Sequence, residues 1–76
     1  MVENSVSLAM RNFISECKKK NFHKQTAMAL GTIAGSKQAL LVYGDTESSF
    51  RALTTLVTQY NDEQTVINEF MKTVKE

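Results

Sequence analysis

Apolar side chains recur at intervals of three and four residues in three parts of the chain, and this spacing limits the fold more than any other feature. The series are Val6/Met10/Phe13/Cys17, Phe50/Leu53/Val57/Tyr60 and Val66/Phe70/Val74. Because an α-helix turns once in about 3.6 residues, each series forms one apolar stripe along a helix. Proline is absent, which leaves few helix-breaking residues. The spacing predicts an all-α fold, a small antiparallel bundle of three or four helices, in which residues 1–76 form a single helical domain.

The predicted core comes from these stripes, and the predicted helix ends come from polar residues between them. We expect the buried side chains to include Phe13, Phe50, Leu53, Val57 and Phe70. Side chains that accept a hydrogen bond from the first turn of a helix are the preferred N-caps. The candidates are Asn4 or Ser5, Asn21, Asp45 or Thr46, and Asn61 with Gln64 completing a capping box.

A stripe of small residues lies in the central stretch, which is read as one long helix between His23 and Gly44. Its members are spaced by four: Ala27, Gly31, Gly35 and Ala39. A glycine in a helix interior costs about 1 kcal/mol relative to alanine, so two of them need a physical reason. Close helix–helix contact along the stripe is the favoured reason, and a break in the helix is the alternative. On the first reading, Leu40–Tyr43 are the buried end of this helix, and Gly44 ends it.

The small size of the chain bears on its assembly. A chain of 76 residues buries only about 60% of its unfolded surface. The single cysteine, Cys17, excludes an internal disulfide, and no Cys/His cluster predicts a zinc site. Extra burial between subunits or a well-packed helical core would compensate, and we expect a homo-oligomer. No signal peptide is predicted, because Met1 is followed by Glu3 and Asn4, and the expected location is the cytoplasm.

Charge is distributed unevenly along the chain. Residues 1–44 carry six Lys/Arg and two Asp/Glu, a net charge of +4, whereas residues 45–76 carry three and six, a net charge of −3. The candidate anion-binding residues are Arg11, Lys18, Lys19, Lys20 and Lys24. The two halves can equally neutralise each other within one subunit. Lys37 interrupts the apolar stretch of the second helix, and no apolar run approaches the ~20 residues that span a bilayer, so no membrane partner is expected.

Part of a DNA-binding pattern lies in the same central stretch. Residues 27–31 have the spacing of the first helix and turn of Cro-like helix-turn-helix regulators, in which a small residue precedes the glycine of the turn by four. The pattern then degenerates, because Lys37 stands six residues after Gly31 where the recognition helix carries an apolar residue. Moving the turn to Gly35 puts Val42 and Tyr43 where polar, base-reading residues belong.

The residue pattern favours binding over catalysis. His23 is the only histidine and has no nearby Ser or Cys to activate, and the acidic residues are dispersed, so no catalytic residues, metal ligands or cofactor are expected. The primary hypothesis is a non-enzymatic helical protein-interaction module of the adaptor or inhibitor type, acting as a homo-oligomer on an unidentified protein partner. The alternative is a nucleic-acid-binding regulator with a degenerate helix-turn-helix. A minor alternative is sequestration of a small anionic ligand at a subunit interface.

Overall fold

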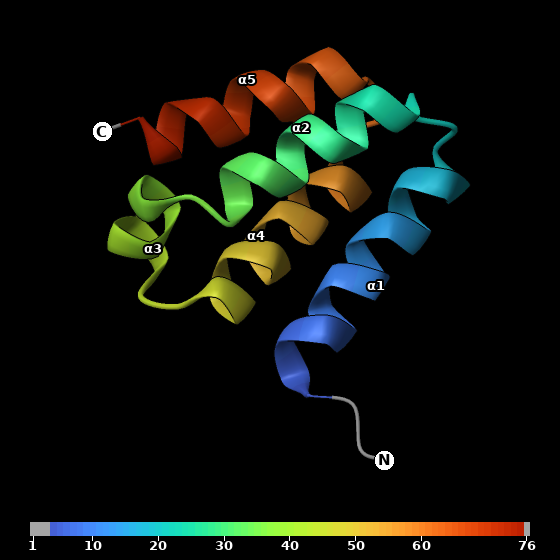
Figure 1. The fold of residues 1–76 in the computed structure, drawn as a ribbon. Coiled ribbons are helices and arrows are strands. Elements are labelled where there is room, and N and C mark those ends of the chain that lie inside the picture. Colours follow the sequence, from blue (N-terminus) through green and yellow to red (C-terminus); the bar gives the residue numbers. More distant parts are fainter. Residues whose placement is uncertain (1–3, 76) are drawn as a thin grey trace.

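The fold is known from a computed structural model that describes residues 4–75. These residues form helices and no strand, so the all-α prediction is confirmed there, with five helices in place of three or four (Figure 1). The helices are α1 (Ser5–Lys19), α2 (Lys24–Ala34), α3 (Lys37–Tyr43), α4 (Thr46–Gln59) and α5 (Glu63–Val74). Residues 1–3, on which the signal-peptide prediction partly rests, lie outside the described part. None of the helices is long and apolar enough to cross a membrane within residues 4–75.

Helix α4 is the centre of the packing, because its contacts with the other four helices are the most extensive in the fold. Helices α2 and α5 lie over it, as Figure 1 shows, and α1 stands along its other flank. The most extensive contact joins α1 to α4, whereas α1 meets α2 only briefly. Helices α1 and α2 therefore both pack on α4 but make little contact with each other.

The core lies between α4 and the helices around it. All five side chains predicted to be core are buried, which confirms that part of the sequence analysis. The rings of Phe13 and Phe50 meet with their centroids 5.9 Å apart, and those of Tyr43 and Phe70 stack at 6.1 Å. The remaining buried apolar residues are Ala9, Cys17, Leu30, Ala34, Ala39, Val66 and Val74.

The single helix expected between His23 and Gly44 is wrong, because the chain breaks at Gly35 and Ser36. Gly35 is the C-cap of α2, and Ser36 is the N-cap of α3. The Ser36 hydroxyl donates to the Ile33 carbonyl at 2.6 Å and accepts from the Ala39 amide at 3.2 Å. One side chain thus satisfies backbone groups at the end of one helix and at the start of the next.

The hydroxyl of Ser49 secures this break from the adjacent helix. Ser49 lies in α4 and is fully buried, and its Oγ donates to the carbonyl of Ala34 at 2.8 Å. Ala34 is the last residue of α2, so its carbonyl has no partner within the helix. The bond therefore fixes the end of α2 against α4.

The other helix ends follow the predictions in part. Asn4 and Asp45 cap α1 and α4 as expected, and Gly44 adopts the left-handed backbone, with φ 93°. The predicted cap Asn61 is wrong: Asp62 caps α5 by accepting from the amide of Thr65 at 3.0 Å. Asn21 also does not cap α2, because it takes a left-handed conformation in the connection, with φ 58°. The N-cap of α2 is His23, without a side-chain hydrogen bond to the helix.

Candidate functional site

An open groove with a volume of about 630 Å³ lies between α1 and α2. We call it the α1/α2 groove. Its lining is apolar apart from one threonine and two lysines at its margin. The residues that line it are Met10, Phe13, Ile14, Cys17, Lys18, Phe22, Lys24, Ala27, Met28, Gly31, Thr32 and Phe50.

The floor of the groove is buried and its edges are exposed. Phe13 and Phe50 form the aromatic part of the floor, and both are almost fully buried. Met10 and Ile14 from α1 and Met28 from α2 lie at the edges, and Met28 is 67% exposed. Large apolar side chains in water at the edge of a concave apolar surface are typical of a site that binds another molecule.

Gly31 leaves the aromatic floor open. A Cβ atom built there would lie 3.8 Å from Cε2 of Phe13 and 3.9 Å from Cε1 of Phe50. These are ordinary van der Waals distances, and both neighbours are ring atoms. The backbone-to-backbone approach expected at this position is therefore absent, and the glycine instead contributes to the depth of the groove.

The small-residue stripe is divided by the break between α2 and α3. Ala27 and Gly31 lie in the wall of the groove, and Ala39 is buried in α3. Gly35 caps α2, and a Cβ atom there would approach only carbonyl oxygens of its own helix, that of Gly31 at 3.6 Å and that of Thr32 at 3.9 Å. The four positions therefore do not form one helix–helix contact within the subunit.

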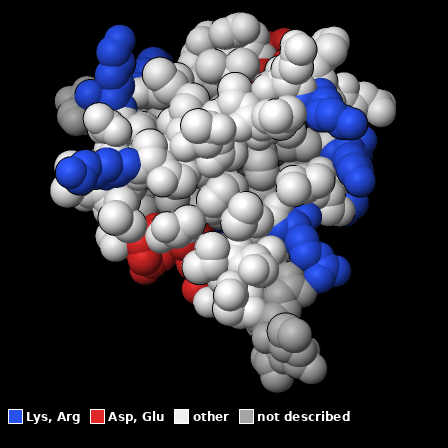
Figure 2. All heavy atoms as spheres, viewed as in Figure 1, with Lys and Arg blue, Asp and Glu red and all other residues white. Residues whose placement is uncertain are grey.

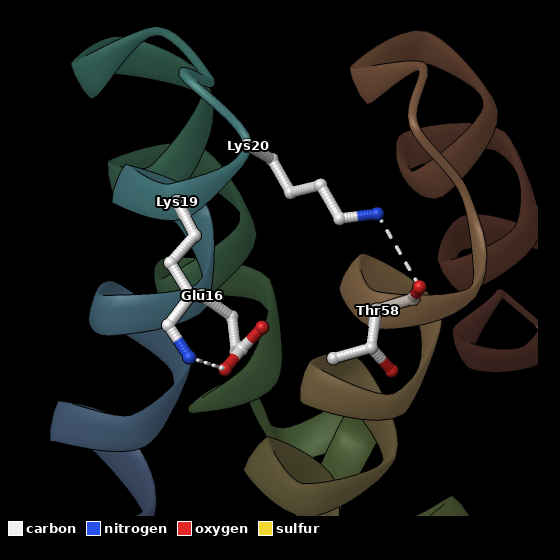
Figure 3. A network of polar contacts seen from close by, with 4 residues as sticks. All are labelled: Glu16, Lys19, Lys20 and Thr58. Atoms are coloured by element: carbon white, nitrogen blue, oxygen red, sulfur yellow. Dashed lines mark hydrogen bonds and ion pairs between the residues drawn. The ribbon is translucent and has the colours of Figure 1, made fainter.

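The candidate anion-binding residues are also divided among different neighbours. Lys19 forms an ion pair with Glu16 at 3.0 Å, and Lys20 points the other way, toward the end of α4 (Figure 3). Lys18 and Lys24 border the groove near the α1–α2 connection, and neither forms an ion pair within the described residues. Arg11 does not line the groove. Two of the five lysine and arginine residues thus charge one end of the α1/α2 groove.

Lys20 binds the free carbonyl groups at the end of α4. Its ammonium group donates to the carbonyls of Thr58 at 3.3 Å and of Tyr60 at 3.2 Å, and to Oδ1 of Asn61 at 2.7 Å. Carbonyls at the end of a helix lack partners within it and lie at the negative end of its dipole, so a cation is stabilising there. The lysine therefore serves the fold, which could not be deduced from the run Lys18–Lys20 alone.

Glu63, at the start of α5, binds the connection between α1 and α2. Its Oε1 accepts from the backbone amide of His23 at 3.2 Å, and its Oε2 lies 2.7 Å from Nδ1 of the same histidine. Hydrogen bonds from Thr26 and His23 hold the pKa of Glu63 below its usual value. Together with the Lys20 contacts, this carboxylate fixes the end of the α1/α2 groove that carries Lys18 and Lys24.

Cys17 belongs to the floor of the groove as an apolar group. Its side chain is buried, and burial raises the pKa of the thiol to about 11, with Glu63 and Glu16 adding to the rise. A nucleophilic cysteine needs the thiolate at neutral pH. The environment of Cys17 favours the protonated thiol instead, as expected for a small buried hydrophobe.

A second apolar surface lies on α3 and was not predicted. Leu40–Tyr43 were expected to be buried, but Leu40, Leu41 and Val42 are exposed, and Leu41 is 80% exposed. We call these three residues the α3 patch. The break at Gly35 and Ser36 turns α3 so that only Ala39 and Tyr43 pack inward. Figure 2 shows that the face over α1, α2 and α3 is mostly uncharged, with Lys and Arg side chains at its margins and a group of Asp and Glu side chains at its lower edge.

Neither metal-binding residues nor relatives add to this description. Among residues 4–75, no group of three or more His, Cys, Asp or Glu side chains is placed to hold a metal ion. No protein-family model, curated protein or solved structure matches the chain. The two apolar surfaces and the charges around them are therefore the features of the molecule that bear on its function.

Proposed function

We propose that the chain is a small, non-enzymatic protein-interaction module of the adaptor or inhibitor type, acting as a homo-oligomer in the cytoplasm. The observation that supports this most is the exposure of apolar side chains around a preformed groove. Met10, Ile14 and Met28 surround a floor that is already packed. The packing of the core therefore does not explain why these apolar side chains are exposed to water. Burying a large apolar side chain yields about 1.5–3 kcal/mol, which is available only when another molecule covers it.

The shape of the groove favours a protein segment over a small substrate. The groove is open along its length and offers few polar groups that could orient a reacting molecule. Apolar grooves between two helices commonly receive the apolar face of a third helix. The two lysines at one end add charge without lining the floor. This arrangement supports binding of another helix, either from a partner or from a second copy.

The nucleic-acid alternative has less support from the geometry. In the region that matches part of the helix-turn-helix pattern, α3 exposes Leu40, Leu41 and Val42, which offer no hydrogen bonds to base edges. Lys19 and Lys20 are engaged with other residues of the chain. Titration with duplex DNA at increasing salt tests this alternative, because phosphate-driven binding weakens steeply as salt rises.

Sedimentation equilibrium with one pair of variants tests the proposal. Met28→Lys places a charge at the edge of the α1/α2 groove and keeps a good helix former. Leu8→Lys places the same charge on an exposed apolar position of α1 that does not line the groove. We expect the wild type and Leu8→Lys to self-associate at micromolar concentrations and Met28→Lys to be monomeric. A monomeric wild type, or equal association of the two variants, would contradict the proposal.

A further inference from the structure

We propose that the α1/α2 groove of one copy receives the α3 patch of a second copy, in a head-to-tail contact. This inference rests on the proposed function and specifies the partner of the groove. Both surfaces are apolar and exposed, and they lie on different helices of the same chain. The patch supplies exposed apolar side chains on α3, of which Leu41 is the most exposed, and the groove supplies an aromatic floor.

The contact must join two copies, because the chain cannot make it with itself. Helix α3 packs on α2, α4 and α5, and it makes no contact with α1, which forms one wall of the groove. The Ser49 bond to the end of α2 and the Ser36 cap hold α3 in this position. The α3 patch of a subunit therefore stays away from its own groove while the subunit is folded.

The lengths of the two surfaces agree. Helix α3 has seven residues, which corresponds to a rise of about 10 Å at 1.5 Å per residue. The groove follows α1 from Met10 to Lys18, a rise of about 12 Å by the same measure. One short helix therefore fits along the wall of the groove, and a longer partner helix would extend beyond it.

The charges at the ends of both surfaces agree with one orientation. The groove is positive at the end with Lys18 and Lys24. Helix α3 begins at Lys37, and the exposed Asp45 follows its end, with its carboxylate accepting a hydrogen bond from the Ser48 amide at 2.7 Å. With the end of α3 at the lysines of the groove, Asp45 meets opposite charge and Lys37 lies at the far end. The reverse orientation would bring Lys37 toward two like charges.

The contact is heterologous, because it joins the groove of one copy to the α3 patch of another. Each copy in a pair therefore keeps one of its two surfaces free. A copy whose groove is filled still exposes its α3 patch, and a copy whose patch is seated still has an open groove. Such contacts produce rings when the rotation closes and filaments when it does not. Because one short helix buries a small area, the contact belongs to the weak, reversible class of interface. Association should therefore depend strongly on concentration and weaken as salt rises.

Complementation between two variants tests the head-to-tail contact. Leu41→Asp removes the apolar patch and leaves the groove intact. Gly31→Leu fills the groove above Phe13 and Phe50, leaves the patch intact and raises helix propensity. Leu8→Asp is the control for charge at an exposed leucine. Sedimentation velocity is recorded for each protein alone and for equal mixtures, with Met28→Lys as a second groove variant and circular dichroism to establish folding.

The expected results separate this inference from the proposed function. Each of the two variants alone should sediment as a monomer, Leu8→Asp should sediment as the wild type does, and the mixture should form dimers and nothing larger. If the wild type associates but the mixture stays monomeric, two like surfaces meet or the α3 patch is not the occupant, and the head-to-tail contact is wrong while the oligomer stands. A monomeric wild type would contradict both the head-to-tail contact and the proposed homo-oligomer.

Discussion

Replacing Gly31 with alanine should stabilise the protein. The residue lies within α2, where glycine costs about 1 kcal/mol relative to alanine. The added methyl group would meet ring atoms of Phe13 and Phe50 at 3.8 and 3.9 Å, so no neighbour must move. The gain in unfolding free energy should be about 1 kcal/mol, which raises the melting temperature of a domain this small by about 4–8 °C.

The matched control is Gly44→Ala, where a methyl group also has room but the backbone conformation is unfavourable for a side chain. A Cβ atom at Gly44 would have no neighbour within 4 Å, but the backbone has φ +93°. A side chain in a left-handed conformation costs about 1–2 kcal/mol, so this variant should melt at a lower temperature. Thermal and urea unfolding followed by circular dichroism measure both variants at a protein concentration where the wild type is monomeric.

One result would refute this reasoning about Gly31. If Gly31→Ala melts below the wild type, a neighbouring group lies closer to the glycine than the aromatic rings do. The close backbone approach predicted from the small-residue stripe would then be the better account. If both substitutions destabilise equally, space and backbone conformation do not separate the two glycines in the way described above.

Three further variants or reactions test other parts of the structure. Ser49→Ala leaves the buried carbonyl of Ala34 without its partner, and should lower the unfolding free energy by about 1–3 kcal/mol in urea titrations. Lys20→Met should destabilise measurably in the same assay, whereas Lys19→Met should not, because only Lys20 holds the end of α4. Burial raises the pKa of Cys17 from 9.0 to about 11. At pH 8 the thiol should therefore react with iodoacetamide about 100-fold more slowly in the folded chain than in the unfolded chain. Equal rates by mass spectrometry would show an accessible thiol.

The helices with clean apolar stripes could be predicted from the sequence. Helices α1, α4 and α5 each present one stripe at helical spacing, and Phe13, Phe50 and Phe70 are buried from these stripes. The information is local, because the period alone fixes which side chains share a face. The period does not show which of two apolar faces is covered by another helix.

The break between α2 and α3, and with it the candidate site, depends on contacts that are distant in sequence. Ser49 reaches Ala34 from another helix, and no local pattern pairs a serine with a carbonyl fifteen residues away. The run Leu40–Tyr43 was read as buried because it is apolar, whereas the turn at Ser36 directs most of it to solvent. The α1/α2 groove likewise combines residues of α1, α2 and α4, so its existence could not be predicted from any one stretch.

The pairing of α1 with α4 has a consequence for the order of folding. Helix α1 finds its main partner only across the segment that forms α2 and α3, whereas α4 and α5 are adjacent in the chain and in space. Local contacts form before those that close a long loop, so we expect the α4–α5 hairpin early and the docking of α1 late. Amides of α1 should then exchange hydrogen through openings of lower free energy than those of α4. Because α1 is one wall of the α1/α2 groove, a folding chain lacks this groove until α1 has docked on α4.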